Sequence, residues 1–272
     1  CDKFCSFCVV PYTRGPEYSR SNNSIIDEVN SMVDNGAREI VLLGQNVNAY
    51  QFKNGNKIYR LSDLIDKLTT IKDLKRIRYT TSHPINMDDE LIDLHSNNKK
   101  LMPFLHLPVQ SGSSKILKMM NRKYDVEFYR DIIFKIRDKS PNIEISSDFI
   151  IGYPGESEQD FINTLDLIDD IKFTQSYSFI YSARPGTKSA MIEDNLTKKV
   201  KSERLKILQS KLTDIQHDFN KTHVGKKTSV LVENQSTTNP EYYFGRTPYM
   251  QSVYIKSNNL INGEEKDIKI TS

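Results

Sequence analysis

The hydrophobic positions of the chain follow two alternating periods over most of its length. Short apolar runs predict strands, and between them apolar residues recur at helical spacing. The expected strands are residues 39–46, 76–82, 104–109, 144–152 and 175–182, and the expected helices are residues 24–36, 61–71, 88–97, 126–139 and 156–171. Strands that alternate with helices indicate βα units around a parallel sheet, so the predicted fold class is α/β. The apolar strand centres predict a sheet buried on both faces.

The pattern changes after a longer helix, which we expect at residues 196–222. Short alternating strands follow and predict a small all-β barrel or sandwich; they are residues 227–234, 242–247, 252–257 and 266–272. The sequence therefore divides into residues 1–222 and residues 223–272. At the helix expected from residue 24, Ser24 and Asp27 have the spacing of a capping box, and Gly36 suits the end of that helix.

Composition is that of a globular protein, with 37% hydrophobic and 27% charged residues among 272. No apolar run is long enough to span a membrane, and no signal sequence is present at the start, so we expect a cytoplasmic location without a membrane partner. Residues 184–227 hold eleven basic residues against five acidic ones. Such a block could form a basic face for a polyanion, although ordinary solvated helix faces explain it equally well.

All three cysteines lie within the first eight residues, as Cys1, Cys5 and Cys8 in the pattern C-x3-C-x2-C. Their odd number excludes a closed disulfide framework, and thiolates this close together suit a metal. A structural zinc would need a fourth ligand, which the spacing does not supply, although His83 stays possible. Three thiolates on a four-iron cluster leave one iron open for a small molecule, and this interpretation is favoured.

The run CDKFCSFCVVPYTRGPEYSR resembles the signature of the radical S-adenosylmethionine (SAM) enzymes, and within them the methylthiotransferases. The resemblance continues in family order over essentially the whole chain, through LLGQNVNAY (42–50), TSHP (81–84), HLPVQSGS (106–113), DFIIGYPGES (148–157) and YSARPGT (181–187). The last strands, with GRTPYMQSV (245–253), resemble the RNA-binding TRAM barrel. The resemblance implies a partial TIM barrel followed by a small TRAM barrel.

The same resemblance implies two cofactors, a [4Fe-4S] cluster on the three cysteines and SAM beside it. The residues that match its cofactor-binding regions are Phe7, Gly44, Gln45, Asn46, Ser82, Gln110, Ser111, Asp148, Ile151 and Gly152. Each has an ordinary alternative: the Gly44 region can be a βα turn, Ser111 or Ser113 a helix N-cap, and Asp148 a structural hydrogen-bonding group. A structural role is also the favoured interpretation of His83.

The activity that the resemblance implies is methylthiolation of C2 of N6-isopentenyladenosine next to the tRNA anticodon, by a transferase. Alternatives are threonylcarbamoyl-adenosine in tRNA, an aspartate of a ribosomal protein, or an RNA-binding module with structural zinc. Candidate phosphate contacts are Arg14, Arg20, Lys226, Lys227 and Arg246. Expected partners are the tRNA anticodon loop and an electron donor such as flavodoxin or ferredoxin, and we expect a monomer.

In the family, a barrel strand precedes the cysteine loop, and an N-terminal domain carries three further cysteines for an auxiliary cluster. This chain begins on Cys1. We therefore expect a fragment that lacks the first strand and that domain, and that ends within the TRAM barrel. An unpaired sheet edge would follow, which favours aggregation.

Overall fold

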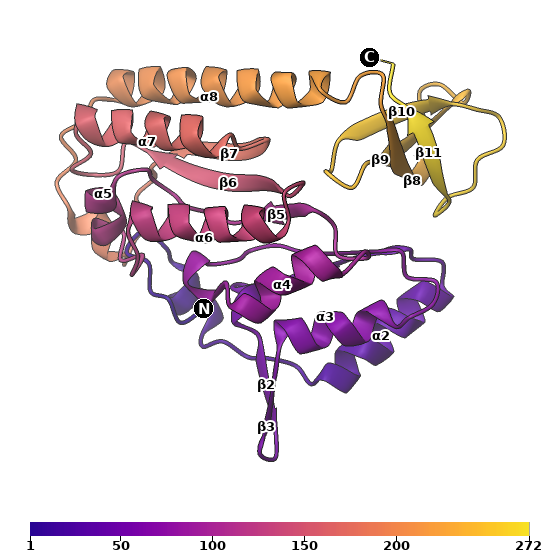
Figure 1. Ribbon diagram of the computed structural model, residues 1–272. Coiled ribbons are helices and arrows are strands. Elements are labelled where there is room, and N and C mark those ends of the chain that lie inside the picture. Colours follow the sequence, from indigo (N-terminus) through magenta and orange to yellow (C-terminus); the bar gives the residue numbers. More distant parts are fainter. Residues whose placement is uncertain (272) are drawn as a thin grey trace.

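A computed structural model describes residues 1–271, which form a half-barrel of parallel strands with helices outside it and a separate C-terminal sheet (Figure 1). The parallel strands are β1 (Glu39–Leu42), β4 (Arg76–Tyr79), β5 (Phe104–His106), β6 (Glu144–Ile151) and β7 (Gln175–Ile180). Strand β1 pairs with β4, and β6 pairs with both β5 and β7. A bridge between Ile77 and Leu101 connects the two groups. This sequential order confirms the expected partial barrel.

Amphipathic helices pack on the outer face of the strands. They are α2 (Asn22–Asp34), α3 (Leu61–Thr69), α4 (Asp89–Asn97), α6 (Val126–Lys139), α7 (Glu158–Ile171) and the long α8 (Lys198–Lys221). Their apolar faces form one core with the outward side chains of the strands, in which Ile77, Leu105 and Phe149 are fully buried. Each expected helix is confirmed to within a few residues, because helical periodicity survives in the amphipathic pattern.

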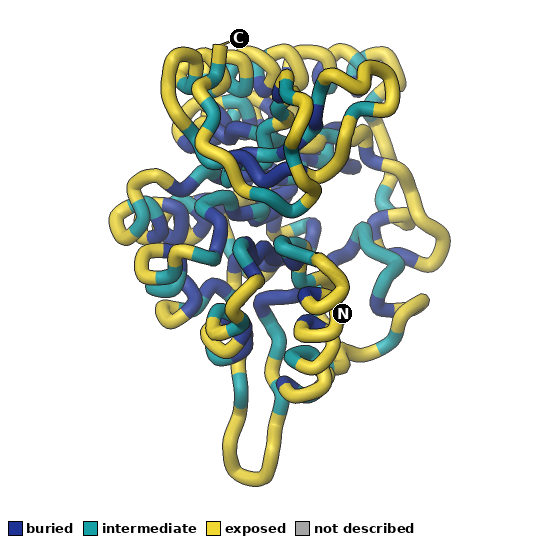
Figure 2. Tube along the Cα trace, turned by 90° about the vertical axis from the view of Figure 1, so that its right-hand side faces the viewer, coloured by how far each residue is buried: buried dark blue, intermediate teal, exposed yellow. Residues whose placement is uncertain are grey.

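Several short elements were not predicted. They are α1 (Val10–Arg14), α5 (Ser114–Met119), the 3-10 turns Val47–Ala49, Pro84–Asn86 and Lys188–Met191, and the hairpin of β2 (Gln51–Asn54) and β3 (Lys57–Arg60). The hairpin projects from the body of the protein and is mostly exposed (Figure 2). The expected capping box is wrong: Ser21 is the N-cap and accepts from the Ser24 N–H, because the helix begins at Asn22. Gly36 follows that helix with φ of 98°.

The inner face of the half-barrel is polar. The expected burial of the sheet on both faces holds for β4, whose four residues are all buried, but not for β7, where Tyr177 and Phe179 are exposed. Alternate side chains point inward, so Arg76 and Arg78 of β4 share this face. His106 lies beside Ser146, with Nδ1 2.9 Å from its Oγ, and His106 Nε2 is 3.5 Å from Asp148 Oδ2. In the sequence, alternating polar residues within RIRY (β4) and EISSDFII (β6) indicated this face. They were overlooked because the apolar residues between them made the two runs read as apolar strands.

The C-terminal strands form an antiparallel sheet in the order β10, β9, β8, β11. Their bounds are β8 (Lys227–Gln235), β9 (Tyr242–Arg246), β10 (Ser252–Lys256) and β11 (Glu265–Lys269). Residue 272 of the last expected strand lies outside the described residues. The sheet has its own small core of Val230, Val232, Tyr243 and Ile255.

Two buried arginines of β4 attach this sheet to the half-barrel. Arg76 donates to the Glu265 carboxylate from Nη2 at 2.7 Å and from Nε at 3.0 Å, and to the Arg246 carbonyl at 2.8 Å. Arg78 donates to the carbonyls of Pro248 and Thr247 at 2.8 and 3.2 Å. Arg76 is the first residue of β4, so the C-terminal sheet covers the amino-end edge of the barrel strands. Arg78 also pairs with Glu39 of β1 at 3.1 Å, so its charge is balanced within the barrel.

Glu265→Gln should lower the free energy of unfolding by about 2 kcal/mol, because Arg76 then stays buried without a counter-ion. Asp267→Asn, exposed on the same strand, is the matched control and should change stability by less than about 0.5 kcal/mol. Urea unfolding measures both. Equal losses in the two variants would contradict the role of the ion pair.

Glu144, at the start of β6, gives a pH-dependent prediction. Burial raises the pKa of its carboxyl from 4.5 to about 7, against the lowering effect of Arg137. Because the pKa is higher in the folded state, the Glu144 carboxyl contributes to the stability of the fold below pH 4.5. This contribution is lost as the pH rises through about 7. Glu144→Gln should therefore be more stable than the parent at pH 8, on the order of 1 kcal/mol after solvent screening. Thermal unfolding from pH 4 to 8 measures this, and Glu193→Gln, which is exposed, should follow the parent curve.

Candidate functional site

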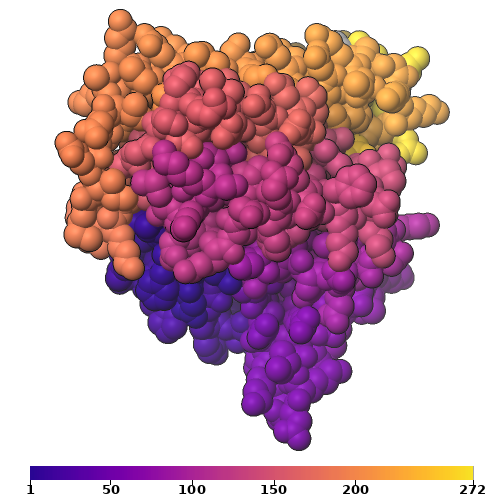
Figure 3. Space-filling model, turned by 60° about the vertical axis from the view of Figure 1, so that its left-hand side comes forward, coloured from indigo at the N-terminus to yellow at the C-terminus, as the bar shows by residue number. Residues whose placement is uncertain are grey.

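The cysteine loop lies at the carboxyl ends of the barrel strands. Ser6 is its anchor: its N–H donates to the Met120 carbonyl at 3.0 Å, and its Oγ donates to the Met119 carbonyl at 2.5 Å. The Ser6 carbonyl accepts from Ser189 Oγ at 2.7 Å. Figure 3 shows the N-terminal residues, in indigo, against the orange segment that precedes α8. Segments from two distant parts of the chain thus hold the loop at the edge where parallel sheets build their sites.

The three thiols are free and differ in burial. Cys5 is buried, and Cys1 and Cys8 are half-buried. The Cys8 N–H donates to the Cys5 carbonyl at 3.0 Å, which closes the turn between them, and Phe7 packs with Ile116, Met120, Tyr153 and Tyr181. Burial raises the pKa of the Cys8 thiol more than the Val10 N–H lowers it. A cavity of about 120 Å³ lies beside Cys5 and Cys8.

Arg122 is the main residue that sequence reasoning missed. It is buried, and its Nη1 lies 3.4 Å from Cys5 Sγ, while its Nη2 donates to the Pro108 carbonyl at 2.8 Å. Its Nε lies 2.9 Å from the Tyr124 hydroxyl. A guanidinium within hydrogen-bond range of the Cys5 sulfur fixes the position of that sulfur. The loop MNRKYD carried no recognisable signal, because only the tertiary fold brings Arg122 to Cys5.

Backbone strain is concentrated at this edge. Among non-glycine residues with positive φ, five lie in the cysteine loop or in the connections beside it: Phe4 (51°), Thr81 (65°), Gln110 (79°), Asn121 (58°) and Lys123 (64°). For a β-branched residue such as Thr81 this conformation is unusual. Asn121 Nδ2 donates to the Phe4 carbonyl at 2.7 Å, which ties two of these residues together. Strained backbone of this kind gathers at functional sites, where surrounding contacts maintain it.

The residues after β1 and β4 contribute unsatisfied polar atoms. Asn46 Nδ2 donates to Glu17 and to Asn86, each at 3.2 Å, but Asn46 Oδ1 and Ser82 Oγ are buried without a hydrogen-bond partner within residues 1–271. Gln45 Oε1 lies 2.5 Å from the Cys1 amino nitrogen, and Gly44 precedes it, exposed. An unpaired buried polar atom is costly, so these positions fit a polar ligand.

The predicted cofactor residues on β6 and in the connection that follows β5 make different contacts. Gln110 bridges to β6, where its N–H donates to the Asp148 carbonyl at 2.9 Å, and Ser111 Oγ accepts from the Ser113 N–H. Ser113, not Ser111, is the N-cap of α5. Gly152 has φ of 70°, and a Cβ there would lie 2.6 Å from Lys201, so glycine is required.

Two of the predicted cofactor residues, Ile151 and Asp148, lie on β6. Ile151 is part of the main apolar core, and Asp148 lies on the inner face beside His106. His83 is buried, and burial lowers the pKa of its imidazole to about 2, so the ring is neutral. Its Nδ1 accepts from the Ile85 N–H at 3.3 Å, which agrees with a structural role.

The candidate phosphate contacts form two separate groups. Arg14 and Arg20 are exposed near the cysteine loop, and Arg20 pairs with Glu28 at 2.5 Å. Lys226, Lys227 and Arg246 belong to the C-terminal sheet, which covers the opposite edge of the barrel. The structure therefore does not bring the five together into one patch.

The three thiols lie on one loop, with Arg122 beside the buried one. Three thiolates on a four-iron cluster leave one iron without a protein ligand. Within residues 1–271, no group of three or more His, Cys, Asp or Glu side chains is arranged to hold one metal ion. No helix within the described residues has the length and apolar composition needed to cross a bilayer.

Comparison with known proteins places this geometry in context. Residues 1–168 match the sequence profile of the radical SAM superfamily. The whole chain is 56% identical to the tRNA-2-methylthio-N(6)-dimethylallyladenosine synthase of Rickettsia canadensis and 54% identical to that of Rickettsia felis. It spans 61% of the length of these relatives.

Solved structures resemble the fold at low sequence identity. Streptococcus suis SuiB bound to S-adenosylmethionine matches 79% of this chain and 45% of its own, with a TM-score of 0.55 at 15% identity. Methylornithine synthase (PylB) matches 78% of this chain and 60% of its own, with a TM-score of 0.50 at 15% identity. At this identity the likeness concerns the fold alone.

Arg122→Met should weaken iron binding by about tenfold or more, because it removes a charge and the one hydrogen bond that positions Cys5. Lys118→Met, which removes an exposed charge from the neighbouring helix α5, should leave iron binding unchanged. Anaerobic iron and sulfide reconstitution, followed by competition with a chelator, measures both. An Arg122→Met chain that retains iron as well as the Lys118→Met chain would contradict this role.

Proposed function

The chain belongs to the radical SAM superfamily, and we propose that it is part of a tRNA methylthiotransferase that acts on C2 of N6-isopentenyladenosine next to the anticodon. The observation that carries the proposal is the three-thiol loop at the carboxyl edge of the half-barrel, with Arg122 beside Cys5. The relatives named above support the substrate, because their similarity extends over the whole chain. They are longer proteins, so the complete reaction belongs to the full-length protein.

Cys1, Cys5 and Cys8 would hold a [4Fe-4S] cluster, and SAM would bind beside it. When bound, these groups supply a one-electron reduction that opens a carbon–sulfur bond of SAM. Asn46 Oδ1 and Ser82 Oγ, which lack partners, would accept or donate hydrogen bonds to the polar end of SAM. Gly152, at the end of β6, is a further proposed contact through its carbonyl, because Lys201 fills the space beside its Cα and Glu156 accepts from its N–H.

The protein's own residues have three tasks in this proposal. Arg122 offsets the negative charge that gathers at the thiolates. Ser6 fixes the loop against the barrel edge, and Phe7 covers its apolar side. We propose in addition an auxiliary cluster in a preceding domain, a flavodoxin- or ferredoxin-type electron donor, a cytoplasmic location and a monomeric state.

The rival functions differ in substrate or in metal. Threonylcarbamoyl-adenosine in tRNA and an aspartate of a ribosomal protein would use the same cysteine loop. An RNA-binding module with structural zinc has less support, because residues 1–271 contain no ligand group arranged for one ion. Reconstitution that gives a colourless protein with stoichiometric zinc would favour the module.

The test of the proposed function is a deletion strain that carries the full-length gene. The parent gene should restore 2-methylthio-isopentenyladenosine in tRNA, and Cys5→Ala should abolish it, because a cluster cannot be held by the two remaining thiols. Nucleoside mass spectrometry measures the product. The 2-methylthio form of threonylcarbamoyl-adenosine, measured in the same samples, should not respond. Restoration of that nucleoside instead would identify threonylcarbamoyl-adenosine as the substrate.

A further inference from the structure

The inner face of the half-barrel carries large side chains that residues 1–271 leave uncovered. In the β6–β7 pairing Asp148 lies opposite Tyr177, and Ile150 lies opposite Phe179, so these four side chains share that face. Tyr177 is 52% exposed and Phe179 is 57% exposed. Neighbouring aromatic rings that stay this exposed on one face of a sheet mark a binding surface.

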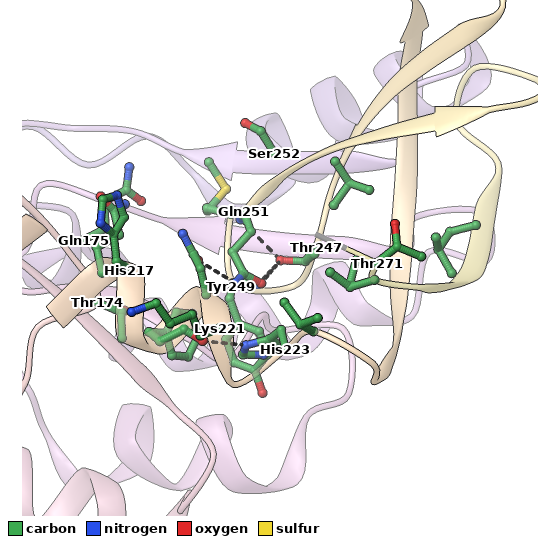
Figure 4. Close-up of a pocket in the computed structure, with 18 of the residues that line it drawn as sticks. Thr174, Gln175, His217, Lys221, His223, Thr247, Tyr249, Gln251, Ser252 and Thr271 are labelled. Carbon is green, nitrogen blue, oxygen red and sulfur yellow. Dashed lines mark hydrogen bonds between the residues drawn. The ribbon is translucent and has the colours of Figure 1, made fainter. Parts of the chain in front are cut away.

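This face extends between the two edges of the barrel. Gln175, two residues before Tyr177 on the same face, lines a cavity of about 740 Å³ beside the C-terminal sheet (Figure 4). Just beyond the other end of β7, Tyr181 packs in the apolar cluster that includes Phe7 of the cysteine loop. Tyr177 lies four residues before Tyr181, roughly 13 Å along a strand. A modified adenine with its C2 beside the cysteine loop can therefore extend its N6 substituent toward Tyr177.

Three side chains on this face hold one another, and we call His106, Asp148 and Tyr177 the inner wall. His106 Nδ1 lies 2.9 Å from Ser146 Oγ, and His106 Nε2 lies 3.5 Å from Asp148 Oδ2. The His106 ring meets the Tyr177 ring edge-on, with centroids 6.3 Å apart. Within residues 1–271 no lysine or arginine pairs with Asp148, so its carboxylate can still accept from a donor on a ligand.

The inner face has a carboxylate beside aromatic rings but no free lysine or arginine on the described barrel strands. The side chains that alternate onto this face from β5, β6 and β7 are Phe104, His106, Glu144, Ser146, Asp148, Ile150, Gln175, Tyr177 and Phe179. Arg76 and Arg78 of β4 share the face, but each is already paired with a carboxylate. A ligand that carries a carboxylate therefore meets repulsion here, whereas an apolar group and an N–H donor are complementary to the inner wall.

We propose that the inner wall selects the N6 substituent of the target adenosine. Asp148, positioned by His106, accepts a hydrogen bond from the N6–H, and the Tyr177 ring packs on the isopentenyl group. The inference rests on the proposed function, because it takes the target adenosine as the ligand.

The chemistry of the two competing substituents explains this selection. The isopentenyl group is a branched hydrocarbon without a polar atom, so it gains from burial against an aromatic ring. The threonylcarbamoyl group of the rival substrate carries a carboxylate, which Asp148 repels. The inner wall thus combines an attractive contact for one substituent with a repulsive contact for the other.

The experiment uses the full-length protein, reconstituted anaerobically with iron and sulfide and kept without reductant. Its ligands are anticodon stem-loop RNAs that differ only at the target nucleoside, which is N6-isopentenyladenosine, N6-threonylcarbamoyl-adenosine or adenosine. Fluorescence anisotropy measures each affinity. The parent should bind the isopentenyl RNA about tenfold or more tighter than the adenosine RNA, as expected for a buried apolar group. Equal affinity of the parent for these two RNAs overturns the inference.

Tyr177→Ala should reduce this preference to about twofold or less, because the ring that covers the isopentenyl group is gone, and Tyr177→Phe should retain the preference. Affinity for the adenosine RNA should stay within about twofold of the parent in both variants, which a general loss of structure would not spare. Phe134→Ala removes an exposed ring from the outer helix α6 and is the matched control, with the preference unchanged. A Tyr177→Ala protein that keeps the preference of the parent overturns the role of the ring.

Asp148→Asn tests the repulsion with a side chain of nearly the same shape. The amide oxygen still accepts from the N6–H, so affinity for the isopentenyl RNA should stay within about threefold of the parent. Affinity for the threonylcarbamoyl RNA should rise about fivefold or more, a gain that damage to the fold would not produce. Asp138→Asn removes an exposed charge from α6 and should change neither affinity. Absence of the gain in Asp148→Asn overturns the repulsion.

Nucleoside analysis in cells separates this inference from the proposed function. If the parent gene restores 2-methylthio-isopentenyladenosine while the Tyr177→Ala and Asp148→Asn proteins bind all the RNAs like the parent, only the inner-wall assignment fails. If the parent gene restores no methylthio nucleoside while both variants shift the RNA preference as expected, the proposed function fails and the inner wall stands.

Discussion

The arrangement of the two sheets depends on the burial of two arginines of β4. Arg76 and Arg78 point into the half-barrel, where an unpaired guanidinium would be very costly. The C-terminal sheet supplies the Glu265 carboxylate for Arg76, whereas Arg78 pairs with the Glu39 carboxylate of β1 and donates to the carbonyls of the β9–β10 turn as well. These contacts hold the second sheet against the barrel.

The opposite edge of the barrel is organised by a different constraint. There the cysteine loop has little secondary structure of its own and depends on hydrogen bonds from Ser6 and on the guanidinium of Arg122. Left-handed backbone at Thr81 and Gln110 persists because neighbouring elements hold it. The protein thus differs between its two edges: the carboxyl edge holds reactive thiols in a strained setting, and the amino edge carries the C-terminal sheet.

Much of the fold could be predicted from the chain pattern. The alternation of apolar runs and amphipathic stretches identified the parallel strands and the flanking helices, because these elements bury one continuous side in a shared core. Short elements without such a side, including α1, α5 and the β2–β3 hairpin, left no comparable pattern. The polar inner face was missed because Arg76, Arg78 and Asp148 alternate with residues that are buried on the outside.

By itself the sequence determined the elements, their order and the three-thiol loop, since periodicity and cysteine spacing are local properties of the chain. The tertiary structure alone decided that Arg122 meets Cys5 across more than a hundred residues, and that Asp148 lies beside His106. It also decided that Tyr177 lies opposite Asp148 on the inner face. Such contacts depend on how strands and helices pack, and packing joins residues whose separation in sequence gives no signal.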